Sequence, residues 1–247
     1  MGFSLDHVVI AVSDLETAIS DYRTLGFTVY PGGVHHGGVS HNALVIFADG
    51  SYFELIAYRQ AAPDVRWWQV LSEAGEGFVD FALLPENTER DVVAARGRGL
   101  DLEGPIAGGR LRPDGARLDW QTVRPKTTDL PFWCGDVTPR TLRVPEGDMR
   151  VHANGATGVA LLRVAVSDVA TSAARYASLA GPGAVNQGNG SAQITLGPTT
   201  FELADDAAAA AHVAKRGEGL MSLVLRGPGA KTLDPKLAHG AALSIAG

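Results

Sequence analysis

LDHVVIAVSDLETAISDYRTLGF, residues 5–27, predicts a strand followed directly by a helix. Residues 5–12 are rich in β-branched and other apolar side chains, as expected of a buried strand. Ser13 is a candidate helix cap, acidic residues follow it, and apolar residues then recur at helical spacing until Gly26, which is placed to end the helix. A short loop therefore joins a β-strand to a helix of about three turns.

The residues that follow predict three more strands. Runs of strand-forming residues occur at 27–30, 42–47 and 52–58. A Pro-Gly-Gly break at 31–33 and an Asp-Gly hairpin signal at 49–50 separate them. The first quarter of the chain therefore predicts a βαβββ unit.

The same signature occurs again near the middle of the chain. LLRVAVSDVATSAARYASLAG, residues 161–181, matches the stretch from His7 at a constant offset without any gap, and YFEL at 52–55 is echoed by TFEL at 200–203. A repeat of this kind indicates that one structural unit is used more than once. The matching pairs are Ala11 and Ala165, Val12 and Val166, Ser13 and Ser167, Asp14 and Asp168, Tyr22 and Tyr176, and Leu25 and Leu179.

The repeat predicts the organisation of the whole chain. We expect a first domain of residues 1–137, in which units 1–58 and 77–137 pair to form the main cup. A second domain, 155–247, is expected to contain the third unit and a truncated fourth. The intervening segments are expected to be linkers because turn formers and charges interrupt their periodicity, namely 59–76 and 138–157.

Composition and charge exclude several classes of protein. The chain is 45% hydrophobic and 19% charged, which is typical of folded globular proteins, and its formal net charge of -6 argues against nucleic-acid binding. The single cysteine, Cys134, fits a reducing compartment. No apolar run approaches the roughly 20 residues that span a bilayer. We expect a cytoplasmic monomer or homodimer that binds a small-molecule substrate, with no nucleic-acid or membrane partner.

Several stretches resemble the vicinal oxygen chelate superfamily, and within it the glyoxalase-like domains. They are LDHVVIAVSDLETAI, GGVHHGGVSHNALVIF with YFELIAY, and then LRPDGARLDW, LPFW and HANGATGV, spread over roughly residues 3–205. The resemblance implies an α+β fold in which repeated βαβββ units of the glyoxalase, bleomycin-resistance and extradiol-dioxygenase type pair into curled mixed sheets. It also implies a cup that holds a divalent metal on imidazole and carboxylate groups.

The resemblance implies metal ligands on the first and last strands of a unit, where this chain has His7 and Glu54. Strand alternation agrees, because Glu54 is out of phase with its apolar neighbours Phe53 and Leu55. His41 is the expected third ligand, and such a set suits zinc, iron, nickel or manganese. The alternative is that His7 is a hydrogen-bonded core histidine and that His41 bonds a loop at its strand end.

Arg112, Trp120 and His35 are the residues expected to contact the substrate. An arginine at Arg110 or Arg112 could grip a carboxylate or phosphate, although ordinary placement on a strand surface explains both equally well. His35 lies beside His36 in a glycine-rich turn, which could also be a solvated or lid-forming loop.

The sequence supports two functions of different classes. The first is a metal-dependent enzyme that acts on a small oxygenated organic molecule by lyase, isomerase or dioxygenase chemistry; its catalytic residues are not identified, and Glu202 or Asp136 is a candidate base if a proton is moved. The second is a metal-free binding or resistance protein of the same fold. Leu161 favours the second, because it replaces His7 in the third unit.

Overall fold

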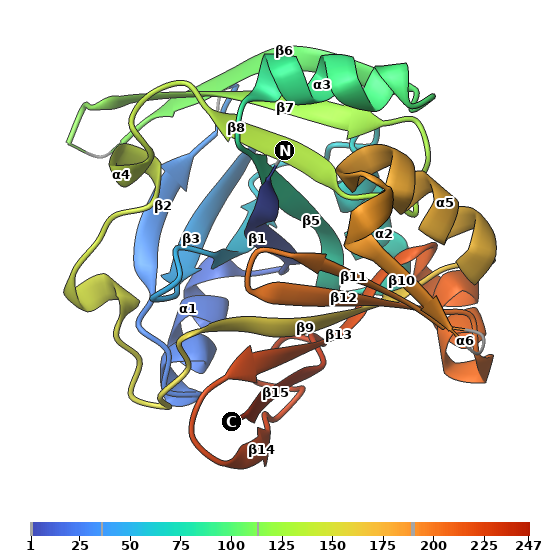
Figure 1. Ribbon diagram of the computed structural model, residues 1–247. Helices are drawn as coiled ribbons and strands as arrows, with labels where there is room; N and C mark the ends of the chain where they lie inside the picture. Colours follow the sequence, from blue (N-terminus) through green and yellow to red (C-terminus); the bar gives the residue numbers. More distant parts are fainter. Residues whose placement is uncertain (1, 36, 113, 189–190) are drawn as a thin grey trace.

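The computed structural model describes residues 2–35, 37–112, 114–188 and 191–247. This part of the chain forms two mixed β-sheets with helices packed on their faces (Figure 1). The arrangement confirms the predicted α+β fold of repeated βαβββ units.

Sheet A is formed by the first half of the chain. Its strands are β1 (Phe3–Ala11), β2 (Tyr30–Val34), β3 (Ser40–Ile46), β4 (Tyr52–Tyr58), β5 (Gly77–Pro85), β6 (Leu102–Leu111), β7 (Arg117–Pro125) and β8 (Phe132–Asp136). They lie in the order β2-β3-β4-β1-β5-β8-β7-β6. Because β1 is parallel to β4 and antiparallel to β5, the first two units meet along β1 and β5 at the middle of the sheet.

Sheet B is formed by the second half and repeats this pattern. Its strands are β9 (Gly158–Ala165), β10 (Val185–Gly188), β11 (Ser191–Leu196), β12 (Thr199–Ala204), β13 (Gly219–Arg226), β14 (Ala230–Thr232) and β15 (Leu243–Ala246). Their order is β10-β11-β12-β9-β13-β15-β14. Here β9 is parallel to β12 and antiparallel to β13, as β1 is to β4 and β5 in sheet A.

Most of the helices begin at a residue whose side chain accepts a hydrogen bond from the first turn. The helices are α1 (Leu15–Thr24), α2 (Arg66–Ala74), α3 (Thr88–Gly97), α4 (Arg140–Arg143), α5 (Val169–Ala180) and α6 (Ala207–Arg216). The cap of α1 is Asp14, one residue after the predicted Ser13; its side chain accepts a hydrogen bond from the Thr17 backbone N–H at 2.7 Å. Within the described ranges, none of these helices has the length and apolar content needed to cross a membrane.

Two local predictions are wrong. The break expected at 31–33 lies inside β2, which begins at Tyr30 and bulges just after Pro31. This is possible because β2 is an edge strand, where a proline need not donate a ladder hydrogen bond. The expected linker 59–76 contains α2, whose apolar residues pack on the sheet.

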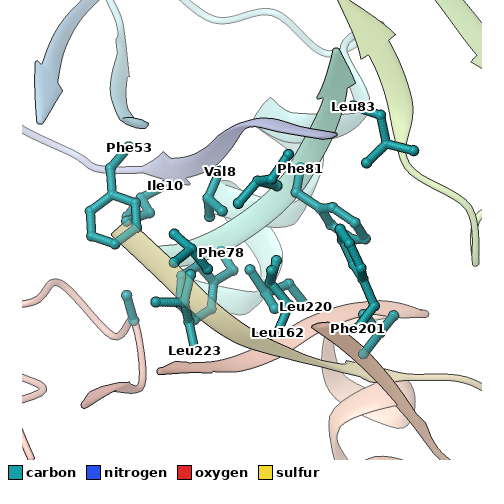
Figure 2. Packing of buried hydrophobic residues seen from close by; sticks show 14 of the residues in the cluster. Val8, Ile10, Phe53, Phe78, Phe81, Leu83, Leu162, Phe201, Leu220 and Leu223 are labelled. Atoms are coloured by element: carbon teal, nitrogen blue, oxygen red, sulfur yellow. The ribbon is translucent and has the colours of Figure 1, made fainter. Parts of the chain in front are cut away.

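The main hydrophobic core lies between the two sheets. Figure 2 shows Val8 and Ile10 of β1 on one side of this core and Leu162 of β9 on the other. Between the sheets, Phe81 of β5 stacks on Phe201 of β12 with 5.7 Å between the ring centroids. The sheets therefore share one core, and burial of these side chains from water holds them together.

The repeat is also visible in the contacts between the two halves. Tyr22 of α1 donates a hydrogen bond to the Ala238 carbonyl at 3.2 Å, and Tyr176 of α5 donates one to the Asp129 carbonyl at 3.3 Å. Each tyrosine thus reaches from one half of the chain into the other. The equivalence of Tyr22 and Tyr176 inferred from the sequence corresponds to equivalent roles in the structure.

The opposite face of sheet A is free of this core. Val8 and Ile10 of β1 face sheet B, so the alternation of side chains along the strand turns His7 and Val9 to the other side. That side packs only partly against α2, through a second small cluster that includes Val9. The candidate site lies on this face of sheet A, which is the concave one.

Candidate functional site

The concave face of sheet A encloses a cavity of about 400 Å³. Both units line it: His7, Asn42 and Glu54 come from β1, β3 and β4, and Trp120 and Phe132 from β7 and β8. Acidic and imidazole groups gather on the side of the first unit, and aromatic rings on the side of the second. Such a mixture is typical of a small-molecule site.

Glu54 is the central charged group of the cavity. Its neighbours Phe53 and Leu55 are fully buried in the main core, so alternation along β4 turns Glu54 to the concave face, where it is 6% exposed. Its Oε1 accepts a hydrogen bond from Asn42 Nδ2 at 2.7 Å. Burial raises the pKa of Glu54, but His35, His7 and Asn42 together lower it to about 2. The carboxylate is therefore ionised at neutral pH.

His7 faces Glu54 across the cavity floor. Its Nε2 lies 3.5 Å from Glu54 Oε2, and its Nδ1 lies 2.7 Å from Asp6 Oδ2. The ring stacks on Tyr52 with 4.7 Å between centroids. The pairing of β1 with β5 shifts register between Leu5 and His7, and Asp6 lies at this irregularity. Asp6 thus holds Nδ1 and leaves Nε2 directed at Glu54.

Asp6 is a fixed negative charge behind His7. It is 0% exposed and accepts hydrogen bonds from Arg143 Nη1 at 2.8 Å and from Arg140 Nη1 at 2.6 Å. Burial raises the pKa of Asp6, but the charges of Arg143 and Arg140 outweigh this and hold it well below the ordinary value of 3.8. An ionised carboxylate bonded to the far nitrogen of a histidine orients the ring and increases the basicity of the other nitrogen.

His35 approaches Glu54 from the end of β2. Its Nε2 lies 3.3 Å from Glu54 Oε1, and its Nδ1 lies 2.9 Å from Ser40 Oγ. Two imidazole Nε2 atoms therefore face opposite oxygens of one carboxylate, and each ring is held on its other side by a polar partner. His36, considered with His35 in the sequence, lies outside the described residues.

The donor set of His7, His35 and Glu54 fits a divalent cation in its chemistry. Two imidazole nitrogens and one carboxylate suit zinc, iron, nickel and manganese, and the partners Asp6 and Ser40 leave both Nε2 atoms directed at Glu54. Within the described ranges, however, no three His, Cys, Asp or Glu side chains are arranged to hold a metal ion. A cation shared by all three therefore requires one of these side chains to turn.

The structure does not bring His41 or Arg112 into the cavity. His41 pairs with Ala57, whose side chain is in the main core, so His41 faces away from Glu54. Burial lowers the pKa of His41, with smaller effects from Arg59 and from acidic residues at the start of α1. Arg112 bonds Asp114 Oδ2 at 2.7 Å and the Leu142 carbonyl at 3.4 Å.

Other sequence candidates are distributed as follows. Trp120 and His35 line the cavity, as expected of substrate contacts. Asp136 is bonded by Arg143 Nε at 2.6 Å and Arg140 Nη1 at 3.0 Å, and is thereby held in the charged network around Asp6. Trp67, expected in a linker, lies on α2 and lines the cavity.

Sequence reasoning missed Asp6, Asn42 and Arg143. Asp6 directly precedes His7, and Asn42 is in phase with Leu44, which also lines the cavity, but the face that both take depends on the register of β3 against β4. Arg143 lies in the expected linker 138–157 and offered no local signal. It reaches Asp6 through a contact between residues 137 positions apart.

Sheet B has no equivalent of this site at the repeated positions. Glu202 corresponds to Glu54, but Arg163 pairs with it in register and its Nε lies 3.1 Å from Glu202 Oε1. In sheet A the residue paired with Glu54 is Val9. The repeat therefore keeps the carboxylate but neutralises it with an arginine.

The curled mixed sheets of paired units are the fold expected from the resemblance to the vicinal oxygen chelate superfamily, and a family model supports it. The family model described as "Glyoxalase-like domain" matches residues 5–180, so the chain belongs to this family. No curated protein matches the chain.

Several solved structures share the fold. A hypothetical protein from Staphylococcus aureus is 13% identical, with 99% of each chain covered and a TM-score of 0.76. A mutant of 4-hydroxymandelate synthase from Streptomyces coelicolor is 12% identical, with 91% of this chain and 71% of that chain covered and a TM-score of 0.61. A xylose isomerase-like TIM barrel/4-hydroxyphenylpyruvate dioxygenase fusion protein is 13% identical, with 91% and 36% covered and a TM-score of 0.58.

Proposed function

We propose that the cavity of sheet A is the active site of a divalent-metal-dependent enzyme that acts on a small oxygenated organic molecule. The observation that carries the proposal is the approach of His7 Nε2 and His35 Nε2 to opposite oxygens of the buried Glu54 carboxylate, at 3.5 and 3.3 Å. The proposed class of enzyme includes lyases, isomerases and dioxygenases. The likeness to 4-hydroxymandelate synthase supports the fold, and the site residues support the cation.

His7, His35 and Glu54 are the residues that would hold the cation. Zinc, iron, nickel or manganese bound there would act as a Lewis acid toward oxygen atoms of the substrate. Asp6 contributes by fixing the orientation of the His7 ring through Nδ1. Asn42 contributes by holding Glu54 Oε1, which limits rotation of the carboxylate.

Tyr52 is placed to act on the substrate itself. It lines the cavity, its ring stacks on His7, and its oxygen accepts a hydrogen bond from Arg143 Nη1 at 2.8 Å. Burial raises the pKa of Tyr52 well above its ordinary value, with Arg143 opposing this. The phenol therefore keeps its proton at neutral pH and can donate a hydrogen bond to a substrate oxygen.

The metal content of purified protein tests the proposal. We expect protein prepared without chelators, or reconstituted separately with zinc, iron, nickel and manganese, to hold a near-stoichiometric amount of at least one of them. Glu54→Gln should lose that metal, because the amide removes the anionic ligand while keeping the shape. Glu202→Gln is the matched control, because Glu202 occupies the repeated position in sheet B and pairs with Arg163; it should keep the metal.

Two results would contradict the proposal. One is the absence of metal from wild-type protein after all four reconstitutions. The other is the same metal content in Glu54→Gln as in the wild type, which would place the cation elsewhere.

A metal-free binding protein of the same fold is the second candidate function. The positions of the second unit that face the first across the sheet carry Ala82, Phe132 and Cys134, which supply no strong ligand and form an apolar wall. Burial also raises the pKa of the Cys134 thiol, which disfavours the thiolate that a metal would bind. A rise in Tm on addition of a small organic ligand to protein that takes up no metal would support this function.

A further inference from the structure

A second cavity of about 390 Å³ adjoins the first. Trp67 of α2, Arg124 of β7 and Phe132 of β8 line both cavities and form their common boundary. The two cavities therefore lie next to each other along these side chains. A molecule seated at Glu54 that is longer than the first cavity would extend past Trp67 into the second.

Trp67 is held in place at this boundary by Asp80. Its Nε1 donates a hydrogen bond to Asp80 Oδ2 at 2.8 Å, and its ring lies 5.5 Å from that of Phe132. Asp80 stands seven residues before the α3 cap Asn87, as His7 stands seven residues before the α1 cap Asp14. At the position equivalent to His7, the second unit therefore has Asp80, which holds the ring of Trp67 in the cavity wall.

The second cavity is lined by more basic than acidic side chains. Arg66, Arg124 and Lys126 line it together with Asp64 and Asp80. Arg66 Nη1 already pairs with Asp80 Oδ2 at 3.0 Å, and Lys126 Nζ lies 3.7 Å from a carboxylate oxygen of Glu103 on the surface. Among the described residues, Arg124 is the basic residue of this cavity that has no acidic partner.

Two hydrogen-bond donors in this cavity have no partner within the described residues. The guanidinium group of Arg124, an exposed residue, forms no hydrogen bond or ion pair there, although its side chain lines both cavities. Thr127 Oγ1 is buried and has no hydrogen-bond partner. A buried hydroxyl left without a partner is destabilising, so an acceptor from a ligand or water is expected beside it.

The other two arginines that line the first cavity are, in contrast, already engaged. Arg143 bonds Asp6 and Tyr52, and Arg110 Nη1 donates to the Gly32 carbonyl. Arg124 is thus the arginine best able to receive an incoming anion. A guanidinium fork matches the two oxygens of a carboxylate, and the buried Thr127 hydroxyl would donate one further bond if its side chain turned toward the cavity.

We propose that Arg124 and Thr127 bind the carboxylate end of an elongated substrate whose apolar or aromatic body lies against Trp67 and Phe132. The inference rests on the proposed function, because it places the oxygenated end of the same molecule near Glu54. The substrate class is a carboxylic acid with an apolar body and an oxygenated far end. The two cavities then serve as the two halves of one binding site.

Binding of a matched pair of probes tests this inference. 3-Phenylpropionate and its uncharged analogue 3-phenylpropionamide have the same body and differ in charge, and Trp67 and Trp120 in the cavity walls allow titration by tryptophan fluorescence. We expect wild-type protein to prefer the acid by about tenfold or more. Arg124→Gln should abolish this preference, and Thr127→Val should weaken binding of the acid.

Arg23→Gln is the matched control for the loss of one positive charge. Arg23 is an exposed residue in the last turn of α1 and lines neither cavity. It should keep the full preference for the acid. Equal affinity of wild-type protein for acid and amide, or an unchanged preference in Arg124→Gln, would overturn the inference.

Glu54→Gln separates this inference from the proposed function. If it keeps the preference for the acid, the carboxylate is bound away from Glu54, as inferred, whether or not metal is present in the wild type. If Glu54→Gln loses the preference and Arg124→Gln keeps it, the carboxylate binds at the proposed cation and the inference is wrong. Metal analysis of the same samples reports on the proposed function independently.

Discussion

Replacing Asp6 by Asn is the sharpest test of the network behind His7. Asp6 is fully buried and accepts hydrogen bonds from Arg143 Nη1 and Nη2 at 2.8 and 3.1 Å and from Arg140 Nη1 at 2.6 Å. The amide would direct N–H donors at these groups and leave the charge of Arg143, itself 5% exposed, compensated only by Asp136. Breaking a buried pair in this way costs about 3–5 kcal/mol, which corresponds to a fall in Tm of roughly 6–20 °C for a chain of this size.

The effect of Asp6→Asn should depend on pH in a defined direction. Because the pKa of Asp6 is lowered in the folded state, its ionised form contributes stability that is fully present above the ordinary value of 3.8 and is lost as the pH falls through the lower folded value. The difference in free energy of unfolding between wild type and variant should therefore be constant from about pH 5 to 8 and shrink below about pH 4. Urea unfolding followed by circular dichroism across this range measures it.

Asp129→Asn is the comparison for loss of a buried carboxylate outside the site. Asp129 is 1% exposed but pairs with a single partly exposed arginine, Arg175, so we expect a smaller loss of about 1–3 kcal/mol. Asp6→Asn should in addition lower metal affinity by about 10- to 100-fold, because the partner of a ligating histidine is lost. The reasoning is refuted if Asp6→Asn is as stable as the wild type at neutral pH, or if the difference grows as the pH falls.

Two further substitutions test the site and the core. Gly32→Ala places a methyl group onto Asn42 Oδ1 and 2.9 Å from the Asn42 carbonyl oxygen, so it should displace the Asn42 amide from Glu54. We expect a loss of about 1.5–3 kcal/mol in the free energy of unfolding, measured by thermal unfolding. Most of this loss should vanish in an Asn42→Ala background. Phe201→Ala removes a fully buried ring stacked on Phe81 between the sheets and should cost about 3–5 kcal/mol in chemical unfolding without changing metal content; a loss under about 1 kcal/mol would contradict the shared core.

Much of the fold could be predicted because its signals are local. The helix caps, the apolar periodicity and the repeat at constant offset each depend on residues close together in the chain, so the βαβββ units were recognisable from 5–27 and 161–181. The same local rules failed at β2, where an edge position accommodates Pro31. They failed again at α2, whose helix is stabilised by packing on the sheet more than by its own sequence.

The site residues also fall into two groups: those that the sequence indicated and those that only the tertiary structure brought together. His7 and Glu54 could be named because the residues around them resemble the glyoxalase-like domains, and alternation along one strand agreed with the orientation of Glu54. The pairing of β1 with β4 then brings the two side chains together. His41 and Asn42 are adjacent, and which of them faces the cavity depends on the register of β3 against β4. Arg143 and Trp67 join the site only because tertiary packing brings distant segments together, and the same packing places His35, which the sequence had suggested as a substrate contact, beside Glu54. Contacts of that kind are set by tertiary packing, for which a single sequence carries no local signal.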